Sequence, residues 1–164
     1  MAAGLLLLGP SATAPARPAL AGVEPFGQVV GSADQLAKSL TQLAAAREAH
    51  AERDLTATRT ELAESWDSFA LARDELRTEP RGIHHAADIA VLAKLANDFE
   101  LAASIWKWII EVSPANTQLE SKQVLQAQVN LSAMLGKLGD NRGSLALARK
   151  TLAGFGEHYS ASHP

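Results

Sequence analysis

Two stretches in the second half of the chain repeat one pattern. Each has an apolar helical segment, a short polar turn and a second apolar helical segment. Alignment places Phe99 on Asn141 and Trp106 on Ala148, an offset of 42 residues. Helical hairpins repeated at a fixed offset stack side by side instead of closing around one core. The repeat therefore predicts an all-α chain, and stacked arrays of this kind usually bind other proteins.

The composition agrees with a helical fold. Apolar residues make up 47% of the chain and aromatic residues only 5%, so Ala and Leu, which favour helices, must build the core. A net charge of −3 and a pI near 5.9 argue against a nucleic-acid-binding surface. The chain has no cysteine, which excludes disulfides, thiolate metal sites and a cysteine nucleophile.

Residues 1–32 differ from the remainder. Their only charged side chains are Arg17 and Glu24, and their apolar run at residues 1–10 is too short to span a bilayer. The sequence Ala19-Leu-Ala-Gly22 resembles a signal-peptidase site. The segment is thus similar to a bacterial secretory signal peptide cut after Ala21, although no Lys or Arg precedes the apolar run. This predicts a secreted or periplasmic protein. The alternative is a disordered leader on a cytoplasmic protein.

Residues 33–80 form a second segment, with no Pro or Gly between Ser32 and Glu79. Its apolar residues recur every seven positions, at Leu55, Leu62, Phe69 and Leu76. Such a stripe is typical of a coiled-coil-like helix or of a helical hairpin. Both interpretations stay open at this point, and a hairpin would turn within residues 50–59.

Residues 81–164 contain the two repeated hairpins. The first begins near Ile83, turns at residues 97–98 and ends at residues 113–116, where Pro114 interrupts the helix. The second begins near Leu119, turns at residues 139–141 and is expected to close at Gly154-Phe-Gly156.

Each hairpin places small residues where its two helices would face each other and larger residues near the turn or beyond it. In the first, Ala90 and Ala102 form a small pair, Phe99 follows the turn, and Trp106 fills the space beyond. In the second hairpin, Ser132 and Ser144 form the small pair, Leu135 takes the position of a large residue on the first helix, and Gly139 lies at the turn. Residues 83–164 therefore resemble tetratricopeptide repeats. The 42-residue offset exceeds the common length of about 34, and it resembles the long repeats of kinesin light chains, in which a His-Pro pair like His163-Pro164 opens the next repeat.

The resemblance implies an α-solenoid fragment whose first helices line a concave groove for a protein or peptide partner. From the first hairpin the lining would be His84, Ala87, Asp88, Val91, Lys94 and Leu95, and from the second Gln126, Val129, Asn130, Ala133 and Lys137. Asn130 holds the position at which long-repeat relatives bond a peptide backbone. Of these residues, we select as partner-binding candidates His84, Val91, Lys94, Leu95, Gln126, Asn130 and Lys137.

No pattern in the chain predicts catalysis, a cofactor or a metal. His84 and His85 are adjacent on a helix and point about 100° apart, so they cannot grip one ion together. The acidic residues are scattered over helix faces, without a pair suited to acid-base work. The sequence therefore predicts a non-catalytic interaction or scaffolding module. The alternatives are a structural homo-oligomer formed through residues 33–79 and a regulatory fragment of a larger repeat protein. Trp106 is expected in the core. Trp108 is expected either beneath the 33–79 segment or, exposed, as a partner contact.

Overall fold

The computed structural model describes residues 31–77, 79–113 and 121–162. These residues form helices and turns without a strand, so the all-α prediction is confirmed. The helices are α1 (Ser32–Ala51), α2 (Leu55–Ala70), α3 (Arg73–Leu76), α4 (Pro80–Leu95), α5 (Phe99–Val112), α6 (Ser121–Lys137) and α7 (Asn141–Ser162). The cleavage site after Ala21, Pro114 and the His163-Pro164 pair lie outside the described residues.

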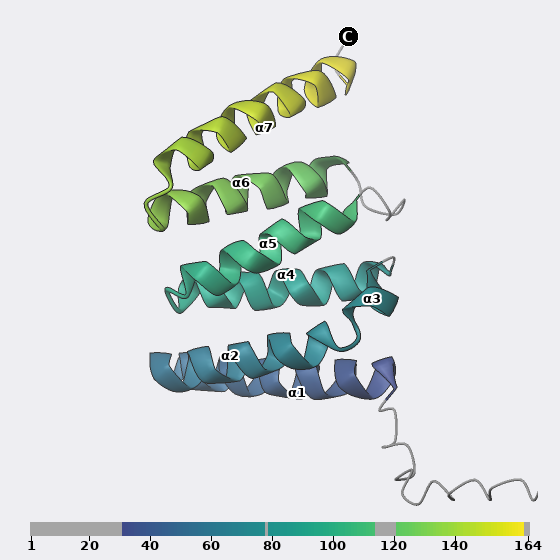
Figure 1. Ribbon diagram of the computed structural model, residues 1–164, viewed down its shortest axis with the longest axis vertical. Coiled ribbons are helices and arrows are strands. Elements are labelled where there is room, and N and C mark those ends of the chain that lie inside the picture. Colours follow the sequence, from purple (N-terminus) through teal and green to yellow (C-terminus); the bar gives the residue numbers. More distant parts are fainter. Residues whose placement is uncertain (1–30, 78, 114–120, 163–164) are drawn as a thin grey trace, which may run out of the picture.

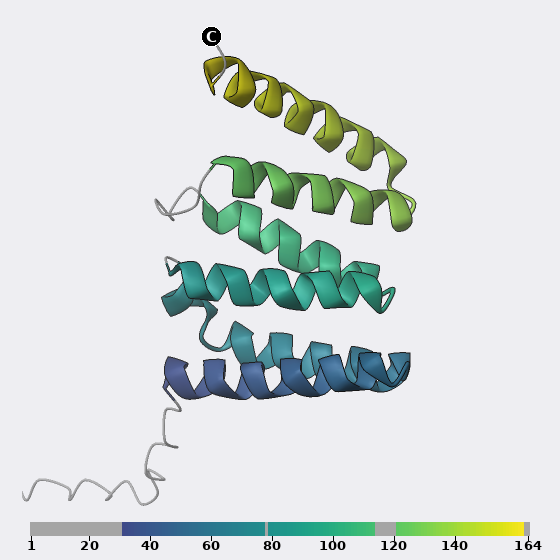
Figure 2. The same cartoon turned by 180° about the vertical axis from the view of Figure 1, so that it is seen from behind.

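The helices pair into three hairpins that stack in chain order (Figure 1). Helix α1 packs on α2, α4 on α5, and α6 on α7, while α5 also packs on α6 and joins the last two hairpins. Figure 2 shows α1 and α4 in front of α2 and α5, with α6 continuing the stack and α7 at its end. The short helix α3 leads from the first hairpin into α4.

The segment 33–79 contains a hairpin and not one long rod. Helix α1 ends at Ala51, and Arg53 takes a left-handed conformation with φ of 64° in the turn. The carboxylate of Asp54 then caps α2 by accepting hydrogen bonds from the backbone N–H groups of Thr56 and Ala57. The chain therefore reverses within residues 50–59, as the hairpin interpretation of this segment predicted.

The seven-residue stripe is mostly buried within this one chain. Leu62 and Phe69 are 0% exposed and Leu76 is 2% exposed, whereas Leu55 remains 39% exposed. Burial of apolar side chains stabilises the fold in proportion to the area removed from water. The stripe thus holds the first hairpin against the rest of the chain, and most of it is not available for pairing with a second chain.

The hairpin of α4 and α5 turns where the sequence indicates. Asn97 has φ of 57°, which asparagine tolerates better than most residues, and Asp98 caps α5 by accepting from the backbone N–H of Leu101. Helix α4 begins at Pro80, three residues earlier than expected, because proline suits the first position of a helix.

The expected end of the last helix at Gly154-Phe155-Gly156 is wrong. Helix α7 passes through both glycines and continues to Ser162. A glycine inside a helix costs only about 1 kcal/mol relative to alanine, and Gly154 lies against α6. A Cβ atom at Gly154 would lie 2.7 Å from a terminal carbon of Leu125, so the glycine permits close packing of α7 on α6.

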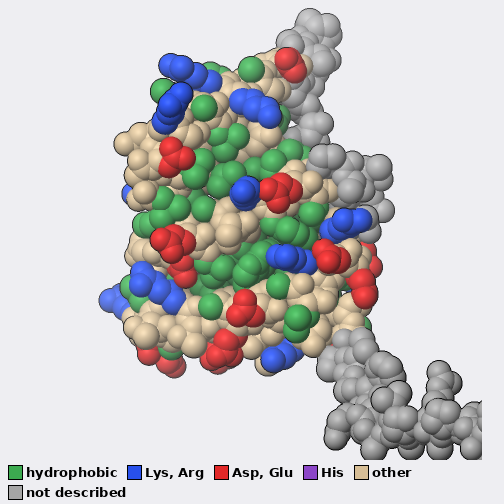
Figure 3. Space-filling view, in the orientation of Figure 1, with side chains coloured by type: hydrophobic (Ala, Val, Ile, Leu, Met, Phe, Trp, Pro, Cys, Tyr) green, Lys and Arg blue, Asp and Glu red, His purple; other side chains and the backbone are tan. Residues whose placement is uncertain are grey.

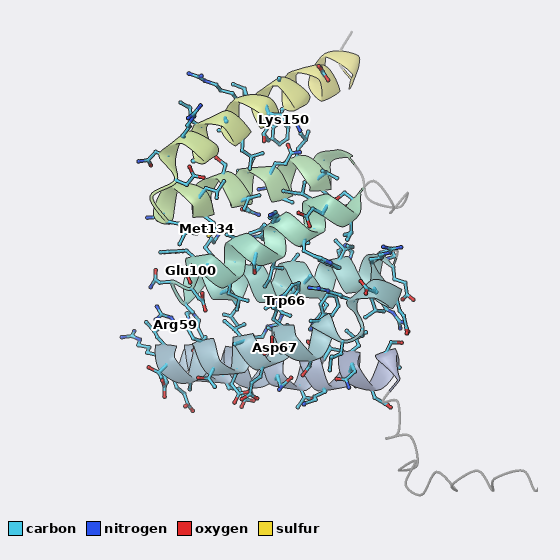
Figure 4. The ribbon with its side chains drawn as sticks, in the orientation of Figure 1. Arg59, Trp66, Asp67, Glu100, Met134 and Lys150 are labelled. Atoms are coloured by element: carbon cyan, nitrogen blue, oxygen red, sulfur yellow. The ribbon has the colours of Figure 1, made fainter. Side chains whose placement is uncertain are left out.

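An aromatic cluster joins the first hairpin to the second. Trp66 stacks on Phe69, and both rings contact Trp108 of α5 edge to face, with centroid distances of 5.9 and 5.5 Å. Figure 4 shows Trp66 between α2 and the α4–α5 pair. The prediction that Trp108 is covered by the 33–79 segment is therefore confirmed. Trp106, at 6% exposure, lies in the core as expected.

No helix within the described ranges is both long and apolar enough to cross a membrane.

Candidate functional site

The most enclosed of the apolar pockets described lies where α4, α5 and α6 meet. It has a volume of about 180 Å³. Its walls include Ile83, His84 and Ala87 of α4, Trp106, Ile109 and Ser113 of α5, and Gln123, Val124, Gln126 and Ala127 of α6. Two of the predicted partner-binding residues, His84 and Gln126, line this pocket and are exposed to solvent. The fold thus brings together side chains that lie 42 residues apart in the sequence.

The other predicted residues lie farther along the same two helices. On α4, Val91 and Leu95 are 42% and 53% exposed, and Lys94 is half-buried. On α6, Asn130 is half-buried and Lys137 is exposed. None of these five lines the pocket at α4, α5 and α6, so the structure joins only His84 and Gln126 in one concave site.

Trp106, one of the residues that line the pocket, carries a buried polar group that its sequence position does not reveal. The side chain is 6% exposed, and its indole Nε1 has no hydrogen-bond partner among the described residues. A buried N–H without an acceptor costs roughly 1–3 kcal/mol, because it has lost its bond to water without gaining another.

A second polar cluster lies in the interior, where α1, α2 and α4 meet. The Ser39 hydroxyl oxygen lies 2.6 Å from His85 Nε2, 2.6 Å from the Ser65 carbonyl oxygen and 3.0 Å from the Ser65 hydroxyl. Ser65 in turn donates its hydroxyl to the Ser39 carbonyl oxygen at 2.8 Å. Sequence reasoning missed this cluster, because its members lie 26 and 46 residues apart and form no local motif.

The hydrogen bonds of this cluster form one consistent set if His85 Nε2 carries a proton. His85 then donates to Ser39, and Ser39 donates to the Ser65 carbonyl oxygen, so each hydrogen has one acceptor. Ser39 and Ser65 are both 0% exposed and His85 is 6% exposed. The Ser–His contact therefore serves to join three helices, since a substrate in solvent cannot reach the Ser39 oxygen.

Burial lowers the pKa of His85 below its ordinary value of 6.5. The nearby Arg47 guanidinium also lowers this pKa, whereas the Asp88 carboxylate opposes the shift. Arg47 and Asp88 themselves form an ion pair of 2.9 Å between α1 and α4. The imidazole is thus held neutral at pH 7, the form that its burial favours.

The depressed pKa predicts that acid weakens the fold. Well above pH 6.5 both folded and unfolded chains hold His85 neutral. As the pH falls below this value, the unfolded chain binds the proton first, so stability declines until the folded pKa is reached. The slope for one proton is at most about 1.4 kcal/mol per pH unit. Urea unfolding between pH of about 7.5 and 5.5 measures it, above the range in which ordinary carboxylates titrate.

The His85→Gln variant is the matched control, because glutamine can donate to Ser39 but does not titrate. Its stability should vary less with pH than that of the wild type. An equal pH slope in both proteins would assign the effect to the other histidines and contradict the role of His85.

Comparison with protein-family models, with curated proteins and with solved structures finds no match to this chain. The class of the protein therefore rests on its own fold, an all-α stack of helical hairpins.

Proposed function

We propose that the protein is a non-catalytic interaction module that binds an extended peptide or protein segment along α4 and α6. The observation that supports this proposal is the apolar pocket at α4, α5 and α6, with His84 and Gln126 on its walls. A concave apolar site with a few polar groups is the common form of a binding site. We propose further that α4–α7 are two tetratricopeptide-like repeats of the long type.

The small residues of the two hairpins are consistent with that repeat assignment. Ala90 and Ala102 are both 0% exposed in the packed pair α4 and α5. In the second hairpin the Ser132 hydroxyl donates to the Ser144 carbonyl oxygen at 2.9 Å, so α6 and α7 come close where the small pair is expected. Small side chains allow such close approach, which larger ones would prevent.

The chemistry of the proposed site suits an extended peptide, which presents both apolar side chains and backbone hydrogen-bonding groups. The pocket offers an apolar floor for one side chain of the peptide. A desolvated peptide backbone needs both donors and acceptors, and the amides of Gln126 and Asn130 supply both. Lys94 and Lys137 would attract acidic groups of the partner.

Replacing Asn130 by alanine should weaken peptide binding by roughly 1–3 kcal/mol, because peptide groups that it bonds would be left unpaired. Peptides selected on the immobilised full chain from a displayed library provide the ligand, and titration calorimetry measures the affinity. The control is Lys107→Ala, an exposed residue of α5 that lies on neither of the two helices, α4 and α6, proposed to line the groove.

Two results would contradict the proposal that the peptide binds in the groove along α4 and α6. The first is that Asn130→Ala and Lys94→Ala both bind the selected peptides as well as the wild type. The second is that Lys107→Ala loses binding, which would place the peptide on the face of α5. Circular dichroism on each variant verifies that the helices persist.

A further inference from the structure

The two ends of the stack carry opposite charge. At one end, the first hairpin presents acidic side chains, and at the other, α7 presents basic ones (Figure 3). Basic side chains also occur near the first hairpin, but its helices α1 and α2 hold an excess of acids. We define the acidic end as Asp34, Glu48, Glu52, Glu64, Asp67 and Leu71. The basic end comprises Arg142, Leu145, Arg149, Lys150 and Leu152.

The basic end is an unpartnered helix face with apolar side chains. Leu145 and Leu152 are 53% and 73% exposed. Arg142 and Arg149 lie on the side of α7 opposite the buried Thr151, because a helix turns about 100° per residue. Arg142, Arg149 and Lys150 form no ion pair with the described residues. The face thus combines exposed leucines with cations that lack a counter-charge.

The acidic end faces the opposite way and is predominantly acidic, with the exposed Lys38 on the same side of α1 as Asp34. Glu64 and Asp67 lie on the side of α2 away from Leu62 and Phe69, which are buried toward the rest of the stack. Glu48, Glu52 and Asp67 also form no ion pair with the described residues. Leu71, at 74% exposure, supplies an apolar contact at the end of α2.

We propose that these two ends bind each other in different copies of the protein, so that the basic end of one copy docks on the acidic end of the next. Opposite charges steer such an encounter, and the exposed leucines supply the apolar area that stabilises it. Two basic ends would repel each other, which disfavours a symmetric dimer through α7. Head-to-tail contacts of this kind produce a closed ring where the rotation between copies closes, and an open chain of copies where it does not.

This interface is separate from the proposed peptide site. The acidic and basic ends lie at the two extremes of the stack, whereas the pocket lies between them at α4, α5 and α6. The proposed self-association can therefore be tested independently of peptide binding.

Light scattering on the full chain at low ionic strength tests the proposal. The weight-average mass should rise with concentration from the monomer value of 17.3 kDa to at least about twice that value, and added salt should reduce it. Reversing charges at either end, by Arg142→Glu with Arg149→Glu or by Glu48→Lys with Asp67→Lys, should weaken association at least about tenfold.

Mixing the two double variants provides the decisive result. Each variant alone has two ends of the same sign and should stay monomeric, but the mixture contains complementary ends and should regain the wild-type mass. A symmetric α7 dimer predicts otherwise, because the Glu48→Lys, Asp67→Lys variant would still associate alone.

The control variant Lys107→Glu with Lys122→Glu reverses two exposed charges away from both ends and outside the proposed peptide-binding residues. It should associate like the wild type. A wild-type protein that stays monomeric throughout the concentration series would overturn the proposal. So would a control that dissociates as readily as the end variants, or a mixture that fails to associate.

Discussion

Replacing Phe69 by alanine should lower the free energy of unfolding by about 3–5 kcal/mol, the largest effect expected of any single substitution proposed for this protein. The side chain is 0% exposed, and its ring contacts Trp66, Trp108 and His85 at centroid distances of 5.5 Å each. Its removal would leave a cavity at the point where α2, α4 and α5 meet. Urea unfolding followed by circular dichroism measures the loss.

The matched control for Phe69→Ala is Leu71→Ala, two residues farther on. Leu71 is 74% exposed, so its truncation should change stability by no more than about 0.5 kcal/mol. Equal losses in the two variants would show that the first hairpin does not pack on the second through Phe69.

Replacing Ala102 by leucine should destabilise the protein by about 1–3 kcal/mol. Ala102 is 0% exposed and lies in α5, which packs on α4. A leucine there adds three carbon atoms to a contact without free volume, so the two helices must separate or the side chain must adopt a strained rotamer. The shift in the denaturant midpoint reports this cost.

Ala63→Leu controls for the substitution itself. Ala63 is exposed on α2, and alanine and leucine have similar helix propensities, so this change should leave the midpoint nearly unaltered. If Ala102→Leu were equally neutral, α4 and α5 would not meet closely at Ala102, and the tetratricopeptide-like assignment of that hairpin would fail.

Part of the candidate site was predictable from the sequence. The 42-residue offset placed His84 and Gln126 at equivalent positions, and the structure puts both on one pocket. The unpartnered state of Trp106 Nε1 among the described residues was not predictable, because it depends on every neighbour that surrounds the indole. For the same reason, no spacing in the sequence could reveal that Ser39 and Ser65 meet His85.

The sequence alone determined the helical class and the turns of the last two hairpins. Ala and Leu spacing and the turn residues Asn97, Asp98 and Gly139 act within a few positions along the chain, so local physics suffices for them. The choice between a long rod and a hairpin for residues 33–79 was decided only by the tertiary structure. There the apolar stripe is buried against α1 and the next hairpin, which stabilises the reversal at Arg53. The continuation of α7 through Gly154 was decided likewise, since close packing against Leu125 offsets the low helix propensity of glycine.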